Sequence, residues 1–386
     1  MMLCRRVLTM ALMTLAVVIA MTGGRTGQAQ SAAAGQVPLF EADPAWPRIP
    51  NDWVLGTVTS VAVGTNDHVW VIHRPRSVAA DRRAKAAPPV LEFDAAGTFV
   101  RGWGGDNAAY DWPSAEHGIF LDHQNNIWIT GSNPSGGLPD QPTDNMVLKF
   151  TSTGQFLRQL GGRGKPGGNA ETTHFERAAD VAVFPPTNEL FVADGYGNRR
   201  VAVFDADSGA FKRMWGAFGK APDTAPPAPL GPPPPSTQGS EQEQPEGAPL
   251  FAKPVHSVRI SRDGLVYVAD RTNRRIQVFK TSGEYVTQVF INRSESPSAC
   301  GMAFSPDPAQ RFLYVADYGN SRLVVLDRQT LTVLYQFGGR GPQPGQFQGL
   351  HQLSADAKGN LYAVEVAPGN RVQKFIAKGF GAPPSR

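Results

Sequence analysis

Short apolar runs recur along this chain at nearly regular intervals. The clearest are five-residue runs rich in Val, Ile, Leu, Tyr and Trp, which end at His73, Gly131, Asp194, Asp270, Asp317 and Glu365. The last three of these ends are 47 and 48 residues apart. Runs of this length and composition predict β-strands rather than helices.

Each run is one strand of a larger repeat. Another apolar strand precedes it, a third follows, as in Val201–Phe204 and Ile276–Phe279, and a fourth completes the first five units, as in Tyr285–Phe290. Four strands repeated every 47 to 48 residues predict the blades of a propeller. Turns such as Asn198–Arg200 and Asn273–Arg275 resemble those of NHL-type repeats. The sequence therefore predicts an all-β, six-bladed β-propeller of NHL-type repeats.

The sixth unit has no fourth strand of its own. Because a propeller must close its ring to protect a sheet edge, we expect residues near 36–46 to form the outer strand of the last blade. The predicted organisation is a signal peptide at 1–29, an N-terminal segment with the closing strand at 30–52, the propeller at 53–379 and a tail at 380–386.

Composition supports this fold and marks its loops. The chain of 386 residues has 41 glycines and 33 prolines, and only 18% of its residues are charged, which favours many short strands joined by turns. Residues 219–252 include Pro232–Pro235 and predict a surface loop. Shorter loops at 75–89 and 132–145 follow second strands, where they could border a binding site.

The N-terminus has the features of a targeting segment. Arg5 and Arg6 precede the apolar run Val7–Met21, and small residues follow near Ala29. This arrangement predicts a cleaved secretory signal peptide and a secreted or periplasmic protein. An uncleaved membrane anchor is the alternative, although the run is short for a span.

Cleavage changes the charge and the cysteine count. The formal charge is +4, and residues 1–29 hold three arginines and no acid, so the mature chain is close to +1. This charge predicts no nucleic-acid partner. Cys300 alone remains after Cys4 is removed, so no intramolecular disulfide is expected. We expect a monomer that is not bound to a membrane.

Three histidines share one position of the repeat. Counting fourteen residues back from the end of each second strand gives Thr59, His117, Asp180, His256 and His351 in blades 1, 2, 3, 4 and 6, and a longer turn places Gly301 there in blade 5. Alternate blades of a six-bladed ring are about 120° apart, so the three histidines should converge on the central channel. Such a trigonal set predicts a zinc site with an open position; histidines bonded to water are the alternative. Asp180 is not assigned as a ligand.

The motifs resemble the lyase domain of the peptidylglycine α-amidating enzymes. Segments around His117, His256 and His351 look like that family's zinc-histidine segments, and Asp194–Arg199 matches its catalytic-tyrosine segment. The likeness implies catalytic roles for Tyr196, Arg74 and Arg271. It also implies a structural calcium, but Gln352 replaces the family's aspartate, and a neutral amide is a poorer calcium ligand. We therefore expect weak or absent calcium.

The resemblance implies a zinc-dependent carbon–nitrogen lyase. Its substrate would be a small molecule or peptide ending in an N-substituted α-hydroxyglycine, which the enzyme would cleave to an amide and glyoxylate. Two alternatives stay open at this point: a non-enzymatic NHL propeller that binds a protein or peptide, and a zinc hydrolase that uses the same site.

Overall fold

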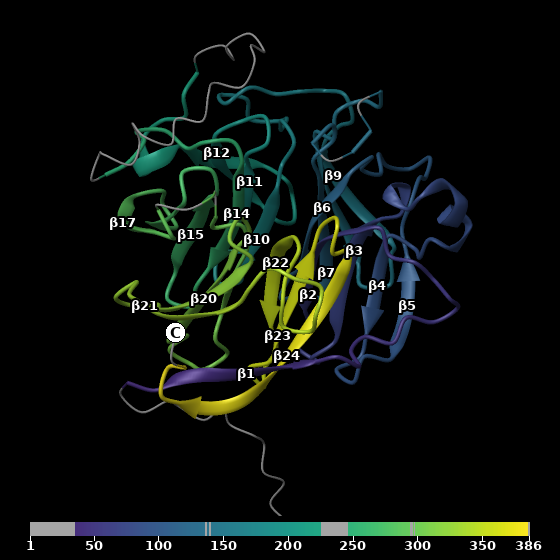
Figure 1. Ribbon diagram of the computed structural model, residues 1–386. Coiled ribbons are helices and arrows are strands. Elements are labelled where there is room, and N and C mark those ends of the chain that lie inside the picture. Colours follow the sequence, from purple (N-terminus) through teal and green to yellow (C-terminus); the bar gives the residue numbers. More distant parts are fainter. Residues whose placement is uncertain are drawn as a thin grey trace, which may run out of the picture.

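The strands form six four-stranded antiparallel sheets arranged as the blades of a propeller (Figure 1). The computed structural model describes residues 35–135, 137–138, 140–224, 246–293, 296 and 298–384. The predicted all-β, six-bladed fold is confirmed within these ranges. The predicted signal peptide, residues 1–29, and most of the predicted loop at 219–252 lie outside them.

The blades follow one another along the chain, and in each the strands run in order from the channel to the rim. Blade 1 contains β2 (Thr57–Val63), β3 (Val69–Arg74), β4 (Val90–Phe93) and β5 (Phe99–Trp103). Blade 2 contains β6 (Glu116–Leu121), β7 (Asn126–Gly131), β8 (Met146–Thr151) and β9 (Phe156–Gly161). Blade 3 contains β10 (Asp180–Phe184), β11 (Glu189–Asp194), β12 (Arg200–Asp205) and β13 (Phe211–Trp215).

Blades 4 to 6 repeat the same arrangement. Blade 4 contains β14 (Val255–Ile260), β15 (Leu265–Asp270), β16 (Arg275–Lys280) and β17 (Tyr285–Phe290). Blade 5 contains β18 (Met302–Phe304), β19 (Phe312–Asp317), β20 (Arg322–Asp327) and β21 (Val333–Gly338). Blade 6 contains β22 (Leu350–Ala355), β23 (Leu361–Glu365), β24 (Arg371–Gly381) and the N-terminal strand β1 (Val37–Asp43).

Strand β1 closes the ring as predicted. It pairs antiparallel with β24 and forms the outer edge of blade 6, where purple and yellow strands lie side by side in Figure 1. Strand β24 runs to Gly381, two residues beyond the predicted end of the propeller. The Phe40 ring of β1 also contacts Tyr314 and Phe337 of blade 5. The closing strand therefore joins the two ends of the chain and packs on the neighbouring blade.

Hydrophobic side chains fill the spaces between neighbouring blades. In β19, Phe312 and Tyr314 face blade 6 while Leu313 and Val315 face blade 4. Equivalent clusters lie at the other blade interfaces of the described chain. A strand buried on both faces needs apolar residues at every position, which explains the continuous apolar runs of the second strands.

A buried polar network explains the turn residues of the repeat. In blade 3, Asp194 Oδ2 accepts hydrogen bonds from Asn198 Nδ2 at 2.7 Å and from Arg200 Nε at 2.9 Å. In blade 4, Asp270 binds Asn273 and Arg275 in the same way. The end of the second strand and the start of the third are thus fixed together, so these residues are structural.

The two shorter insertions have different structures. Residues Pro75–Ser77 and Ala80–Lys85 form 3₁₀ helices η1 and η2 after β3, whereas no helix or strand is present in the described part of 132–145. A third 3₁₀ helix, η3, covers Ala217–Gly219.

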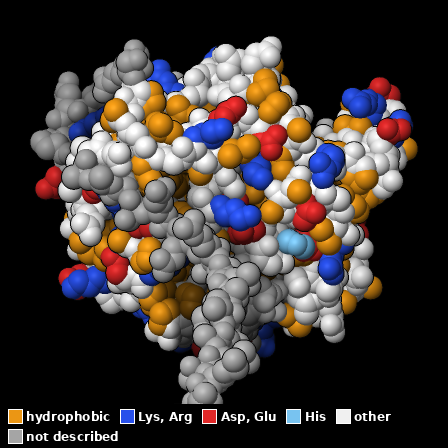
Figure 2. All heavy atoms as spheres, turned by 90° about the horizontal axis from the view of Figure 1, so that it is seen from below, with side chains coloured by type: hydrophobic (Ala, Val, Ile, Leu, Met, Phe, Trp, Pro, Cys, Tyr) orange, Lys and Arg blue, Asp and Glu red, His pale blue; other side chains and the backbone are white. Residues whose placement is uncertain are grey.

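No described helix has the length and apolar character needed to cross a membrane. Figure 2 shows acidic and basic side chains interspersed over the face seen from below.

Candidate metal centre

The inner strands of blades 2, 4 and 6 each carry one histidine at an irregularity in strand pairing. Pairing shifts between Val255 and Ser257 and between Leu350 and Gln352, which places His256 and His351 at β-bulges. His117 lies within the equivalent shift of β6. A bulge redirects the side chain of the extra residue, and in this ring it directs the imidazoles toward the channel.

The three imidazoles converge, as the repeat position predicted. Their ring centroids form a nearly equilateral triangle, with separations of 5.0 Å (His117–His256), 4.9 Å (His117–His351) and 4.6 Å (His256–His351). One nitrogen from each ring lies within 4.8 Å of the other two. All three side chains are buried.

Each imidazole is oriented by a backbone carbonyl of the next blade. His117 Nδ1 donates to Ala179 O at 2.6 Å, His256 Nδ1 to Cys300 O at 2.7 Å and His351 Nδ1 to Thr59 O at 2.6 Å. Even-numbered blades therefore supply imidazoles and odd-numbered blades supply the carbonyls that hold them. A proton on Nδ1 leaves the lone pair on Nε2, the form that binds a metal.

Two positions assigned by counting are wrong by one residue. The strand pairing puts Ala179 and Cys300 at the histidine level in blades 3 and 5, instead of Asp180 and Gly301. The turn of blade 3 is one residue longer than that of blade 4, because Phe184 pairs with Glu189 whereas Ser261 bonds to Leu265. Asp180 consequently lies one residue deeper in the channel.

The nitrogen geometry fits a bound cation. His256 Nε2 and His351 Nε2 are 3.1 Å apart, and both Nδ1 atoms are already donors to carbonyls, so two lone pairs face each other. Ligands about 2.1 Å from a tetrahedral ion are about 3.4 Å apart. Burial lowers the pKa of His351 to about 3 and the pKa values of His117 and His256 well below their ordinary value. At neutral pH the three imidazoles are therefore uncharged and could hold a metal ion.

Tyr196 lies directly beside this cluster. Its Oη is 2.9 Å from His117 Nε2, and its ring packs edge-on against that imidazole. A Cβ at Gly195 would lie only 2.0 Å from Val255 O, so glycine permits the chain to turn toward the channel at this point. Arg177 Nη2 donates to Tyr196 O at 2.9 Å and fixes the turn.

Two arginines border the same site. Arg74 is buried and donates from Nε to Glu116 O at 2.8 Å and from Nη2 to Ser132 Oγ at 3.0 Å. The Arg271 guanidinium lies near two aromatic rings, 5.9 Å from that of Tyr196 and 5.7 Å from that of Tyr318. Burial raises the pKa of Tyr196, and the charges of Arg271 and Arg74 oppose that increase. The structure thus brings together all six residues predicted for the site.

Sequence reasoning did not identify several neighbours. Cys300 Sγ is 3.4 Å from His256 Nδ1, and the Tyr318 ring lies 5.7 Å from the Arg271 guanidinium. Glu116 precedes His117, accepts a hydrogen bond from Trp112 Nε1 at 2.8 Å, and has its pKa raised to about 7 by burial. The repeat offered a signal for Tyr318. It follows Asp317 at the repeat position where Arg271 follows Asp270, so it could have been predicted to lie at the same level of the ring.

The fold and the site define the class of protein: an NHL-repeat propeller with a three-histidine cluster in its channel. A model of the NHL repeat matches residues 255–279. Mouse NHL repeat-containing protein 3 is 31% identical over 75% of this chain and 70% of its own length. The human protein of that name is 29% identical over 88% of this chain and 84% of its own length. The chain belongs to the family of NHL repeat-containing protein 3.

The expected resemblance to amidating lyases is also confirmed as homology. Peptidyl-alpha-hydroxyglycine alpha-amidating lyase 1 of Drosophila melanogaster is 26% identical over 88% of this chain and 60% of its own length. This match is more distant than those to the NHL repeat-containing proteins, so the reaction named for the fly enzyme is not thereby assigned to this chain.

Proposed function

We propose that this protein is an exported, zinc-dependent lyase that cleaves an N-substituted α-hydroxyglycine to an amide and glyoxylate. The observation that carries the proposal is the 2.9 Å approach of Tyr196 Oη to His117 Nε2, within a cluster of three imidazoles flanked by two arginines. The distant homologues named as amidating lyases support the same reaction class.

Zinc is the metal that best suits the donor set. Three neutral imidazoles are a common protein ligand set for catalytic zinc, with the fourth position open to water or substrate. Oxygen-seeking cations such as calcium and magnesium prefer carboxylate and carbonyl ligands. Zinc bound by His117, His256 and His351 would supply positive charge that makes a nearby hydroxyl more acidic.

The protein's own residues account for substrate binding and proton movement. Arg74 and Arg271 offer guanidinium groups to the substrate carboxylate, which they can bind through paired hydrogen bonds. The charges of Arg271 and Arg74 oppose the effect of burial on the pKa of Tyr196, and a cation held by the three histidines would lower that pKa further. In its phenolate form, Tyr196 would take the proton of the α-hydroxyl. The carbonyl of glyoxylate then forms as the carbon–nitrogen bond breaks, and the bond's electron pair goes to the amide nitrogen. Tyr196 returns the proton to that nitrogen, so no net proton is consumed.

A non-enzymatic role is the second candidate. The more similar relatives carry a name that records only their NHL repeats, which is consistent with a propeller that binds a protein or peptide at its loops. A zinc hydrolase acting on an ester or lactone is a third use of the same residues. Glyoxylate formation distinguishes the lyase from both.

The test is a glyoxylate assay with the zinc-loaded protein and a simple N-acyl-α-hydroxyglycine. We expect glyoxylate and the amide in equal amounts, and we expect the activity to disappear after chelation and return with zinc. His256→Ala should lose the activity. His123→Ala is its matched control and should keep the activity, because His123 lies in an exposed turn. Substrate binding without glyoxylate release would refute the lyase and favour the binding propeller.

The location and partners belong to the same proposal. The basic and apolar N-terminal segment supports export to a secreted or periplasmic location, where a monomer would meet its small-molecule or peptide substrate. Fractionation of the producing cells, with N-terminal sequencing of the exported chain, tests this part. A chain that retains residues 1–29 and stays with the membrane would contradict it.

A further inference from the structure

A buried ion pair lies one layer below the three histidines. Asp180 is fully buried, and its Oδ2 lies 2.6 Å from Arg259 Nη1. The same oxygen accepts a hydrogen bond from Ser257 Oγ at 2.7 Å and one from Gln352 Nε2 at 3.3 Å. One carboxylate oxygen therefore connects the inner strands of blades 3, 4 and 6 across the channel.

Two of the hydrogen bonds to this carboxylate come from residues next to a histidine of the site. Ser257 follows His256, and Gln352 follows His351. Asp180 itself follows Ala179, whose carbonyl holds His117 Nδ1. A displacement of the Asp180 carboxylate would therefore be transmitted to all three imidazoles.

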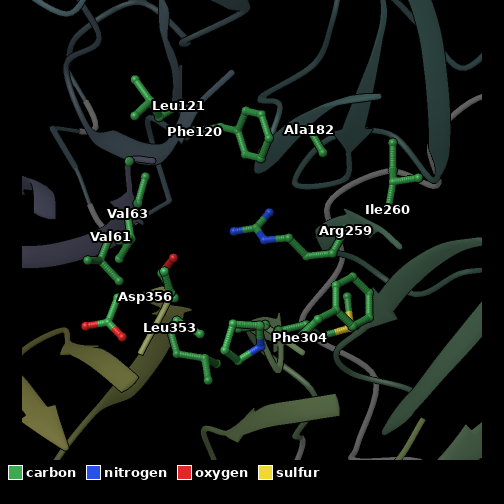
Figure 3. Close-up of a pocket in the computed structure, with 18 of the residues that line it drawn as sticks. Val61, Val63, Phe120, Leu121, Ala182, Arg259, Ile260, Phe304, Leu353 and Asp356 are labelled. Carbon is green, nitrogen blue, oxygen red and sulfur yellow. The ribbon is translucent and has the colours of Figure 1, made fainter. Parts of the chain in front are cut away.

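Arg259 supplies the cation of this layer. Its guanidinium projects into a cavity of about 460 Å³ at the far ends of the inner strands, opposite the histidine end (Figure 3). The Phe120 ring lies 5.9 Å from the guanidinium, and the arginine side chain is only 12% exposed. The charge of Asp180 is thus neutralised from within the chain.

Calcium does not fit this layer. Gln352, which replaces the aspartate expected of a calcium site, points its amide nitrogen at Asp180. The buried oxygens Ser60 Oγ, Asp180 Oδ1 and Gln352 Oε1 have no hydrogen-bond partner among the described residues, but they include a single charged group, and Arg259 already balances it. A divalent ion would add uncompensated charge in a buried channel.

We propose that Asp180 and Arg259 form a positioning hub for the three-histidine site, with the guanidinium as the resident cation of this layer. The hub comprises Asp180, Arg259, Ser257 and Gln352. The inference rests on the metal site of the proposed function but not on its reaction. Residues that orient metal ligands typically contribute 10- to 100-fold to metal affinity.

The first experiment measures metal binding by Asp180→Asn, which keeps the shape and removes the charge. We expect zinc affinity, measured by competition with a chelator, to fall about 10- to 100-fold, and the visible spectrum of the cobalt-substituted protein to change. Arg262→Met is the control and should leave zinc affinity unchanged, since Arg262 lines the same cavity as Arg259 but is exposed. A folded Asp180→Asn protein with unchanged zinc affinity and cobalt spectrum would overturn the hub.

Two further variants keep the test decisive. If Asp180→Asn does not fold, Ser257→Ala removes one hydroxyl from the hub and should still change the cobalt spectrum; an unchanged spectrum would count against the proposal. Arg259→Met removes the resident cation, so calcium should raise its melting temperature more than that of the wild type. An equal calcium response in both proteins would show that Arg259 does not serve as the cation.

The hub and the proposed reaction can fail separately. A wild-type protein that binds zinc but releases no glyoxylate refutes the reaction, while the loss of affinity in Asp180→Asn still supports the hub. Glyoxylate release by the wild type, combined with unchanged zinc affinity in Asp180→Asn, refutes the hub alone.

Discussion

The imidazole of His117 is held on both of its nitrogens, by Ala179 O at Nδ1 and by Tyr196 Oη at Nε2. The residue types of this site could be read from the sequence, because a repeat places equivalent positions at equivalent heights. The carbonyls that orient the rings could not be predicted in this way, because every type of residue has a backbone carbonyl. Cys300 contributes its carbonyl, which holds His256 Nδ1 at 2.7 Å, and its thiol, which lies 3.4 Å from the same nitrogen.

Tyr196→Phe tests the proposed base. The change removes the phenolic oxygen and keeps the ring that packs against His117. We expect turnover to fall about 10²- to 10⁴-fold, the usual contribution of a general base, while zinc content stays the same. Tyr285→Phe, on an outer strand, is the control. Full activity in Tyr196→Phe would mean that another group takes the proton.

Arg74→Ala tests the carboxylate contact. Loss of this buried cation should reduce kcat/KM about 10²-fold, because the substrate carboxylate and the developing oxyanion both lose a nearby cation. Arg76→Ala is the matched control, since Arg76 is two residues away and pairs with the exposed Asp106. Equal kinetics for both variants would remove Arg74 from the site.

At the scale of the elements, bulges and turn lengths determine the height and direction of each side chain in the channel. The β-bulges of blades 2, 4 and 6 direct the histidines inward, and their presence could not be deduced from hydrophobic pattern alone because a bulge adds a residue without altering the apolar runs around it. The same limitation explains the misplacement of Asp180. A turn one residue longer shifts the count by one, although the strands themselves were correctly predicted.

An ion pair within blade 3 is also linked to blade 4 by a hydrogen bond. Arg213 binds both oxygens of Glu189, at 2.8 and 2.7 Å, and donates from Nε to Thr281 O of blade 4. The hydrogen bonds from Arg213 lower the pKa of Glu189 to about 2. A depressed carboxyl pKa stabilises the fold above the unfolded-state value, near 4.3, and this contribution disappears as pH falls from there through about 2.

Glu189→Gln should therefore reduce the free energy of unfolding at pH 7 by about 1 kcal/mol, a value discounted for solvent screening. The difference from the wild type should shrink below pH 4 and vanish near pH 2. Denaturant titrations of both proteins at several pH values measure it. A difference that does not depend on pH would show that the charge of Glu189 is unimportant.

At the scale of the whole molecule, six equivalent blades make the site. The sequence predicted the ring and its closure because the sixth unit lacked an outer strand and an apolar strand remained at the N-terminus. The channel interior was less predictable, since Asp180 and Arg259 meet across neighbouring blades although 79 residues separate them in sequence, and neither belongs to a motif.

Removal of β1 tests ring closure. A chain that begins at Trp46 would expose the edge of β24 and lose the contacts of Phe40 with Tyr314 and Phe337. An unpaired edge promotes aggregation, so we expect loss of soluble, cooperatively unfolding protein. A truncated chain with an unchanged melting temperature would show that the ring does not need this strand.

The most direct test of the central claim is the metal content of the purified protein beside that of His256→Ala. We predict one zinc ion per wild-type chain after dialysis and essentially none in the variant, with the fold retained in both. Zinc-free wild-type protein that cannot be reloaded, or equal zinc in His256→Ala, would contradict a metal centre built from His117, His256 and His351.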